Sequence, residues 1–420
     1  MPSDQRLAQG LARRTRHMSR SAIREILKVA SQPGVISLAG GVPAPESFPL
    51  ELMHRLSRDV IQKYAHRAFQ YDLTEGFTPL REALAPHLMH RSIHVAPDHI
   101  LITSGSQGAL DALGKILISP GDLLAVESPT YLGALQAFTP YEPRYAAIPC
   151  DGEGVIPEAL DEMLMRQPVK FVYLVPTFQN PSGRTLSPAR RQAIAGLLEA
   201  HNTYLIEDDP YSDLRYEGQA VAPIKSLIPD RVIYVGTLSK VFAPGLRIGY
   251  CIAPEPVRSW LVLAKQGVDL HTSTFDQALA AEYLLGGHLH DHLPHILALY
   301  RPRQSAMLEA LADFMPPEFR WSRPQGGMFV WVEGPAGIDL ATVYPEAIRQ
   351  QVAYVPGYFF FTEAGAGLNT MRLNFTMPTP EEIRSAVRTL GMLVRAFRNK
   401  RLQGRIKGSR RAAKCVPCWP

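Results

Sequence analysis

Short apolar segments with strand character alternate with helical segments through the middle of the chain, and this alternation constrains the fold more than any other feature. The predicted strands lie at 100–103, 122–127, 170–175, 203–206, 232–235 and 248–252. Helical periodicity returns between them, for instance at residues 78–90 and 188–201. Strands that alternate with helices predict a mainly parallel, doubly wound sheet. Ligands of such sheets bind beyond the carboxyl ends of the strands.

Polar clusters follow several of these strands at the point where each strand ends. The clusters occupy residues 104–107, 128–131, 176–183 and 207–211. Because the carboxyl ends of parallel strands meet at one edge of a sheet, we expect these side chains to converge. The first cluster joins a strand to a helix through a Gly/Ser turn, an arrangement that favours phosphate binding. The sequence therefore predicts one ligand site assembled from several strand ends.

A lysine, Lys240, stands between the last two predicted strands. A proline and a glycine follow it, so we expect it in a constrained loop and not on a solvated helix. Removal from water lowers the pKa of a lysine, and a neutral amine can form a Schiff base with a carbonyl. Thr237, Ser239 and Arg247 in the same stretch could surround a phosphate. A structural lysine in a hairpin-like turn is the alternative.

A Schiff-base lysine beside phosphate donors points to pyridoxal 5′-phosphate (PLP), which carries both an aldehyde and a phosphate. PLP needs a carboxylate at its ring nitrogen, and Asp208 can supply it. Asn180 and Tyr211 can donate to the ring hydroxyl, and Tyr131 can stack on the ring. Arg372, inside an apolar strand, could clamp a substrate carboxylate, although a buried arginine can also be structural.

Four motifs occur together in a fixed order along the chain. They are Asn180-Pro181-Ser182-Gly183, Asp208 with Tyr211, Ser239-Lys240 with Ala243-Pro244-Gly245-Leu246-Arg247-Ile248-Gly249, and Arg372-Leu373-Asn374-Phe375. Over about residues 20 to 398, this combination resembles the fold-type I, PLP-dependent aminotransferases of class I/II. The resemblance implies that Lys240 forms the aldimine with PLP and shuttles the proton. It also implies phosphate contacts from Ser106, Gln107, Thr237, Ser239 and Arg247.

The N-terminal part is similar to the 2-aminoadipate/kynurenine aminotransferase subgroup and to the effector domains of related transcription regulators. The likeness rests on Ser21-Ala22-Ile23-Arg24-Glu25-Ile26-Leu27-Lys28 and on Leu38-Ala39-Gly40-Gly41-Val42-Pro43-Ala44-Pro45-Glu46. It implies that Arg24 pairs with a distal substrate carboxylate; an exposed helix residue is the alternative. Gly40 and Gly41 permit a substrate to approach the backbone closely. Tyr71 matches a tyrosine that reaches the phosphate of the neighbouring subunit, which implies a homodimer with shared active sites.

The fold that the resemblance implies is α/β, of the PLP transferase fold type I. A large domain with a mainly parallel, seven-stranded-type mixed sheet flanked by helices is expected beside a smaller α+β domain, built from the N- and C-terminal parts. We expect an N-terminal extension at 1–20, a segment at 21–60 that contributes to the small domain and the site, and the large domain at 61–290. The C-terminal small domain then covers 291–398, and a disordered basic tail covers 399–420.

The expected function is the transfer of an amino group from an amino acid to a 2-oxo acid, with 2-oxoglutarate as the acceptor. The reaction would run as two half-reactions through the Lys240 aldimine, in a ping-pong mechanism. A lyase, decarboxylase or racemase is an alternative, because the same cofactor serves all of these reactions. A non-catalytic, PLP-binding regulator is another, although about twenty residues before the aminotransferase-like region are too few for a winged-helix domain.

The positive charge of the chain is concentrated near its end. Nine of the 44 basic residues lie between positions 395 and 414, where no acid occurs. Such a segment can contact nucleic acid or anionic lipid, but we interpret it as a solvated tail. The partners that we expect for the protein are small-molecule substrates. No apolar run reaches the ~20 residues that cross a membrane. Four scattered cysteines form no disulfide framework, which favours a reducing cytoplasm, and Cys415 and Cys418 are assigned no role.

Histidines gather in the middle of a predicted helical region at 275–311. They are His288, His290, His292 and His295. Their spacing does not place all four on one helical face, and carboxylates or thiolates are scarce around them. We therefore predict a surface run of histidines and no metal site.

Overall fold

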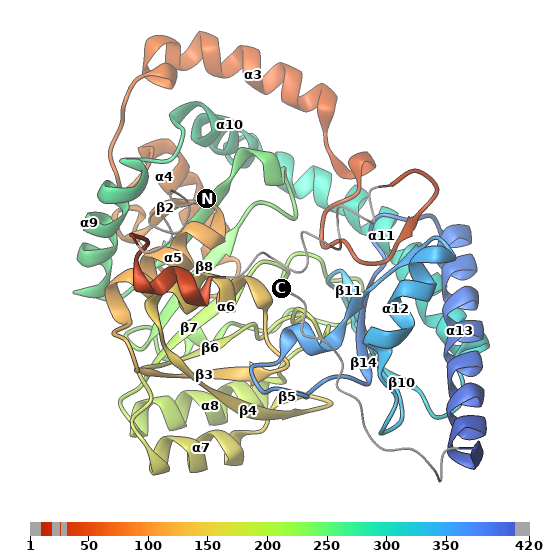
Figure 1. The fold of residues 1–420 in the computed structure, drawn as a ribbon. Helices are drawn as coiled ribbons and strands as arrows, with labels where there is room; N and C mark the ends of the chain where they lie inside the picture. The colour runs from red at the N-terminus through yellow and green to blue at the C-terminus, as the bar shows by residue number, and fades with distance from the viewer. Residues whose placement is uncertain (1–9, 19–25, 27–31, 408–420) are drawn as a thin grey trace.

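The computed structural model describes residues 10–18, 26 and 32–407, and the side chains as far as residue 398 (Figure 1). Within these residues a large sheet has eight strands in the order β2-β9-β8-β7-β6-β3-β4-β5. The strands are β2 (Leu101–Ser104), β3 (Leu123–Ser128), β4 (Arg144–Asp151), β5 (Gly154–Val155), β6 (Phe171–Leu174), β7 (Tyr204–Asp209), β8 (Val232–Thr237) and β9 (Ile248–Ile252).

The sheet is mixed, as the sequence predicts. Strands β4, β3, β6, β7 and β8 pair in parallel, whereas β9 is antiparallel to both β8 and β2. The eighth strand, β5, is a two-residue edge strand paired with β4, which accounts for the difference from the seven strands expected. The central strands β6 and β8 are buried along their whole length. A strand covered on both faces needs a continuous apolar run, and this is the pattern that the sequence displays.

Helices cover both faces of the large sheet (Figure 1). Leu164 and Leu198 of the helices α7 and α8 pack against Val172 of β6. The next residue, Tyr173, points to the other face and packs with Phe138 of α6, because side chains alternate along a strand. The helices of this part are α3 (Leu50–Tyr64), α4 (Thr78–Met89), α5 (Gly105–Leu117), α6 (Leu132–Phe138), α7 (Pro157–Arg166), α8 (Pro188–Ala200), α9 (Val257–Asp269) and α10 (Thr274–Leu285).

A second, smaller sheet lies beside the first. Its antiparallel order is β10-β11-β14-β13, and a separate parallel pair joins β1 of the N-terminal part to β12 of the C-terminal part. The strands are β1 (Ile36–Ser37), β10 (Arg320–Trp321), β11 (Phe329–Glu333), β12 (Val352–Ala353), β13 (Val355–Pro356) and β14 (Thr370–Asn374). The helices are α11 (His288–Phe314), α12 (Leu340–Arg349) and α13 (Pro380–Lys407). The domain boundaries given above stay a prediction.

Short 3₁₀ helices complete the chain. They are η1 (Arg13–His17), η2 (Pro45–Ser47), η3 (Ala65–Phe69), η4 (Pro97–His99), η5 (Thr139–Tyr141), η6 (Ile224–Ser226), η7 (Pro244–Leu246) and η8 (Gly357–Phe360). Two further differences from the expected elements have local causes. The apolar pattern at 319–332 predicts a strand, but the structure has two strands, β10 and β11, with a break between them where Gly327 has a φ of +74°. The amphipathic pattern at 380–398 predicts a helix, and α13 continues beyond it to Lys407 through residue types that mostly favour helices.

Three expectations concern membranes, metals and the tail. No described helix is long and apolar enough to cross a membrane. Of the clustered histidines, His292 contacts a tyrosine: its Nδ1 lies 2.8 Å from Tyr283 Oη. The described residues hold no group of three or more His, Cys, Asp or Glu side chains that could bind a metal ion. Residues 408–420, including Cys415 and Cys418, lie outside the described part of the chain.

Candidate active site

Lys240 lies in the turn directly after β8, at the carboxyl edge of the large sheet. Its Nζ donates a hydrogen bond to the carbonyl oxygen of Gly41 at 2.9 Å. Burial, together with the positive charges of Arg247 and Arg372, lowers the pKa of Lys240 to about 8. An amine with this pKa is partly neutral near physiological pH and can act as a nucleophile or a base.

Asp208 stands near the end of β7 and has one oxygen without a partner. Its Oδ2 accepts a hydrogen bond from Tyr173 Oη at 2.8 Å. Its Oδ1 is buried and has no hydrogen-bond partner among the described residues. Burial raises the pKa of Asp208 to about 7. A buried, unpartnered carboxylate oxygen is costly unless a donor completes it, so this atom fits the ring nitrogen of PLP.

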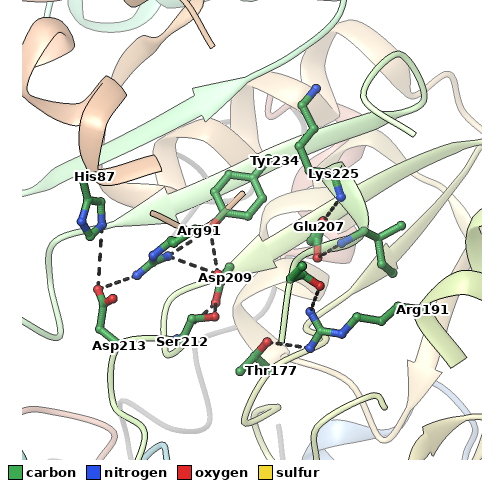
Figure 2. A network of polar contacts seen from close by, with 12 residues as sticks. His87, Arg91, Thr177, Arg191, Glu207, Asp209, Ser212, Asp213, Lys225 and Tyr234 are labelled. Carbon is green, nitrogen blue, oxygen red and sulfur yellow. Dashed lines mark hydrogen bonds and ion pairs between the residues drawn. The ribbon is translucent and has the colours of Figure 1, made fainter. Parts of the chain in front are cut away.

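The neighbouring Asp209 points to the opposite face of the sheet and is fully engaged (Figure 2). Its Oδ2 accepts hydrogen bonds from Tyr234 Oη at 2.7 Å and from Arg91 Nη1 at 3.2 Å. Its Oδ1 accepts from the backbone N–H of Ser212 at 3.2 Å. Because successive side chains of a strand alternate, only Asp208 of this pair is free to face a ligand.

Two arginines, the partly buried Arg91 and the fully buried Arg191, bind two of the loops that follow the strands (Figure 2). Arg91 Nη2 donates to Asp213 Oδ2 at 2.5 Å. Burial opposes the charge of Arg91, but Asp213 and the other acidic groups around it outweigh this effect and raise its pKa. Arg191 Nη2 donates to the carbonyl oxygen of Pro176 at 3.0 Å and to Thr177 Oγ1 at 2.9 Å. These contacts fix the backbone that leads into the candidate site.

Asn180, Tyr211 and Arg372 form a hydrogen-bonded group. Asn180 Nδ2 donates to Tyr211 Oη at 3.4 Å, and Arg372 Nη1 donates to Asn180 Oδ1 at 2.9 Å. Arg372 Nη2 donates to the carbonyl oxygen of Ala39 at 2.7 Å, while its Nε is buried without a partner among the described residues. Burial lowers the pKa of Arg372 to about 10. The free Nε–H is a donor available to a carboxylate.

The phosphate-binding residues expected from the sequence lie on neighbouring segments. The apolar run at 110–118 predicts a helix that begins at residue 110, but helix α5 already begins at Gly105. Ser106 and Gln107 therefore lie in its first turn, where N–H groups are free to bind an anion. Gly105 has a φ of +72°, and a Cβ at this position would come within 2.2 Å of Arg247 Nη2. Thr237 Oγ1 lies 2.9 Å from Ser239 Oγ. This close cradle fits the phosphate of PLP.

Tyr131 and the glycine pair lie beside these groups. Tyr131 precedes α6, and burial together with the charge of Asp208 raises its pKa to about 12, against the opposing charges of Arg372 and Arg247. Gly40 is buried, and a Cβ on Gly41 would come within 3.0 Å of Phe329. The N-terminal loop therefore reaches both Lys240 and Arg372, and its glycines leave room for side chains of the small sheet.

Residues 35–390 match the family model for aminotransferases of class I and II. The chain belongs to this family. The aromatic-amino-acid aminotransferase 1 of Thermococcus litoralis is 48% identical over 90% of the chain and 92% of that protein. The 2-aminoadipate transaminase of Thermus thermophilus is 40% identical over 90% of the chain and 94% of that protein.

Solved structures show the same fold. The kynurenine aminotransferase of Pyrococcus horikoshii, solved in complex with PMP, superimposes with a TM-score of 0.90 and 43% identity, over 93% of this chain and 98% of that one. The prediction of a fold-type I aminotransferase of the 2-aminoadipate/kynurenine subgroup is confirmed. The chain is an enzyme, an aminotransferase that acts on amino acids, and PLP is its cofactor.

Two predicted site residues of the aminotransferase are not brought into this group. Tyr71 projects from the surface with 76% of its area exposed. Its ring and the ring of His271 pack in a T-shaped arrangement, with their centroids 5.6 Å apart. Arg24 lies outside the described residues. The structure thus brings together the predicted residues that follow the strands of the large sheet, with Arg372 and the glycine pair, and leaves Tyr71 facing outward.

The candidate site also contains residues that the sequence did not predict. The rings of Phe329 and Phe360 lie 4.3 and 5.1 Å from the guanidinium carbon of Arg372. Phe360 belongs to the aromatic stretch at 354–361, which the sequence alone leaves open between core and pocket, with core as the default. Tyr173, the partner of Asp208, has a weak signal: a tyrosine within a buried apolar strand needs a polar partner for its hydroxyl.

Proposed function

We propose that this aminotransferase moves the amino group of an aromatic amino acid to 2-oxoglutarate, with the two substrates reacting in turn at one site. The aromatic surround of Arg372 carries this proposal. Phe329 and Phe360 flank the guanidinium that would hold the substrate α-carboxylate, so the space beside the clamp is lined by rings. The 48% identity to an aromatic-amino-acid aminotransferase supports the same substrate class.

Bound PLP supplies the carbonyl carbon that takes up the amino group and a ring that accepts the electron pair released at the substrate α-carbon. Lys240 Nζ removes the proton from that carbon, which its pKa of about 8 permits near neutral pH. Arg372 binds the α-carboxylate through its free Nε–H and orients the α-carbon toward Lys240. The loop at Gly40 and Gly41, which contacts Lys240 and Arg372, would border the bound substrate.

The remaining side chains would hold the cofactor. Asp208 Oδ1 would accept a hydrogen bond from the protonated ring nitrogen, and Asn180 and Tyr211 would contact the ring hydroxyl. Tyr131 would stack on the face of the ring. The phosphate would be bound by Ser106, Gln107, Thr237, Ser239 and Arg247, and Tyr71 of the partner subunit would also contact it. For 2-oxoglutarate, we assign the distal carboxylate to Arg24.

Exposed apolar side chains around Tyr71 support a homodimer with shared sites. Phe69, Leu73 and Leu270 are 67%, 53% and 55% exposed, and Phe69 stacks on Phe275 at 5.6 Å. Exposed apolar side chains of this kind favour a protein interface.

The cysteines Cys150 and Cys251 are free thiols, which favours a location in the reducing cytoplasm. We infer no nucleic-acid partner.

A panel of amino donors tests the proposed substrate class. With 2-oxoglutarate as the acceptor, kcat/KM for phenylalanine or tyrosine should exceed that for alanine and for 2-aminoadipate at least about tenfold, the range in which pocket contacts discriminate between side chains. Double-reciprocal plots at several acceptor concentrations should give parallel lines. A preference for 2-aminoadipate would overturn the aromatic assignment, and intersecting lines would overturn the two-step order.

The acceptor assignment has its own test. Arg24→Ala should lower kcat/KM for 2-oxoglutarate about tenfold and leave that for pyruvate, which has no distal carboxylate, nearly unchanged. Equal effects on both acceptors would remove Arg24 from the proposal.

A further inference from the structure

Tyr173 is a buried tyrosine whose hydroxyl reaches the carboxylate proposed to meet the cofactor ring. It lies in β6, directly beside β7, where its register partner is Ile206. The side chain has no exposed area. Tyr173 Oη donates to Asp208 Oδ2 at 2.8 Å, whereas Asp208 Oδ1 has no partner among the described residues. One oxygen of the carboxylate is therefore held by the protein, and the other is left for a ligand.

The hydroxyl of Tyr173 stays protonated, so it can donate a hydrogen bond, and the packing of its ring restricts its position. Burial raises its pKa well above the usual value, and the nearby charge of Asp208 raises it further, so the phenol keeps its proton. Its ring meets the ring of Phe138 edge-on at a centroid distance of 5.9 Å, which restrains its rotation. The acceptor that the structure places within reach of this hydroxyl is Asp208 Oδ2.

We propose that Tyr173 is a positioning residue: its hydrogen bond holds the Asp208 carboxylate with Oδ1 turned toward the ring nitrogen of the cofactor. The inference rests on the role of Asp208 in the proposed function. A carboxylate has a soft terminal torsion, so without this donor its plane could rotate and take both oxygens out of line with the ring nitrogen. A hydrogen bond to a charged group is also among the stronger ones.

The chain contains a matched comparison for this interaction. Tyr234, in β8 on the other side of β7, is equally buried and donates to Asp209 Oδ2 at 2.7 Å. Both tyrosines are thus phenol donors to consecutive aspartates of one strand (Figure 2 shows the Tyr234 pair). Asp209 faces away from the site, so only the Tyr173 pair should affect the cofactor.

The experiment compares Tyr173→Phe with Tyr234→Phe and with Asp208→Asn in the full-length enzyme. The dissociation constant of PLP is measured by titrating each apoenzyme, and the melting midpoint of each apoenzyme is recorded. Tyr173→Phe should raise the PLP dissociation constant about tenfold, and Tyr234→Phe less than about twofold. Both variants lose one buried hydroxyl, so both should lower the melting midpoint. Equal changes in PLP affinity for the two variants would overturn the proposal.

The pH dependence of PLP binding separates positioning from general loosening. Burial raises the pKa of Asp208, the hydrogen bond from Tyr173 lowers it, and the charge of Asp209 raises it; Tyr131 and Tyr211 also face it. Tyr173→Phe should therefore raise this pKa, and its loss of PLP affinity relative to wild type should grow as the pH falls from about 8 to about 6. A constant ratio across this range would contradict the proposal.

Two further variants secure the interpretation. In the Asp208→Asn background, Tyr173→Phe should change PLP affinity less than about twofold, because the bond it removes no longer serves a carboxylate. If Asp208→Asn itself leaves PLP affinity unchanged, the proposed role of Asp208 fails. If it weakens PLP binding while Tyr173→Phe does not, only the proposed role of Tyr173 fails.

A second substitution at position 173 tests the proposal if Tyr173→Phe does not fold. Fluorotyrosine is of similar size and a stronger donor, so it should shift the pH dependence of PLP binding in the direction opposite to that of Tyr173→Phe. An unchanged pH profile would refute the proposal.

Discussion

Arg372 Nη1 donates to Asn180 Oδ1 at 2.9 Å, and this bond joins β14 of the small sheet to the loop after β6 of the large one. It fixes the orientation of the Asn180 amide, so that Nδ2 faces Tyr211 Oη at 3.4 Å. Arg372 thus links the substrate side of the site to the proposed cofactor side. A change at Arg372 should disturb both.

Arg372→Lys should lower kcat/KM for phenylalanine about 100-fold, because a lysine cannot replace the two held donors and the free Nε–H at once. The measurement compares phenylalanine with phenethylamine, which lacks the carboxylate. The relative loss should be much smaller for the amine. Arg384→Lys, on α13 and 45% exposed, is the control. Equal losses for the acid and the amine would exclude a carboxylate clamp.

Lys240 should titrate well below an ordinary lysine in the apoenzyme. Burial and the charges of Arg247 and Arg372 lower its pKa from 10.5 to about 8, so the neutral amine should be half-populated near pH 8. Competitive acetylation followed by peptide mass analysis should show this midpoint. Arg247→Gln removes a cation that lowers the pKa, so the midpoint should move upward. Lys225, whose pKa burial also lowers to about 8, is the internal control and should not move.

Much of the candidate site can be predicted from sequence because its side chains follow strands. Lys240 comes directly after β8, and Asn180 comes a few residues after β6. Once the alternation of strands and helices predicts a largely parallel sheet, the shared edge brings such residues together. The apolar runs also predict the buried strands, because strands covered on both faces need apolar side chains along most of their length.

Contacts between distant segments could not be predicted in this way. Lys240 meets the carbonyl of Gly41, and no side-chain pattern identifies the backbone atom that a lysine will contact. Phe329 and Phe360 are indistinguishable from core residues until the small sheet packs them against Arg372. The Gly/Ser sequence at the start of α5 has low helix propensity and gives no sign of a helix. The helix nevertheless begins at Gly105, where the turn packs so closely on β9 that a Cβ on Gly249 would come within 2.5 Å of Ser106 N.

Glu127 should make stability depend on pH. It is 3% exposed in β3, and burial raises its pKa to about 8, against the opposing hydrogen bonds from the Val175 N–H and Gln179. Its folded pKa lies above the unfolded value of 4.5, so its contribution to stability is complete below pH 4.5 and is lost as the pH rises through about 8. Glu127→Gln removes this titration and should stabilise the apoenzyme by about 1–2 kcal/mol above pH 8.

Melting midpoints at pH 5.5 and 8.5 would test this expectation for Glu127. The difference between Glu127→Gln and wild type should be larger at the higher pH, since the amide can still accept the Val175 N–H bond without carrying charge. Glu162→Gln, 62% exposed and paired with Arg166, is the control and should show little pH-dependent change. A pH-independent difference would mean that Glu127 is ionised in the folded protein throughout.

Mixed dimers can show whether Tyr71 acts in the partner's site. Tyr71 is 76% exposed in its own chain, whereas Lys240 Nζ contacts the loop of its own chain at Gly41. If Tyr71 contributes to the active site of the partner subunit, a heterodimer of a Lys240→Ala chain and a Tyr71→Ala chain contains one intact site and one site with both defects.

Random reassociation of the two variants makes about half of the dimers heterodimers, and each heterodimer has one intact site. About a quarter of all sites in the mixture should therefore be fully active. If Tyr71 acted in its own chain, both sites of the heterodimer would stay defective and mixing would restore nothing. The ratio of mixed to unmixed kcat, measured after co-refolding and again after separate refolding, distinguishes the two arrangements.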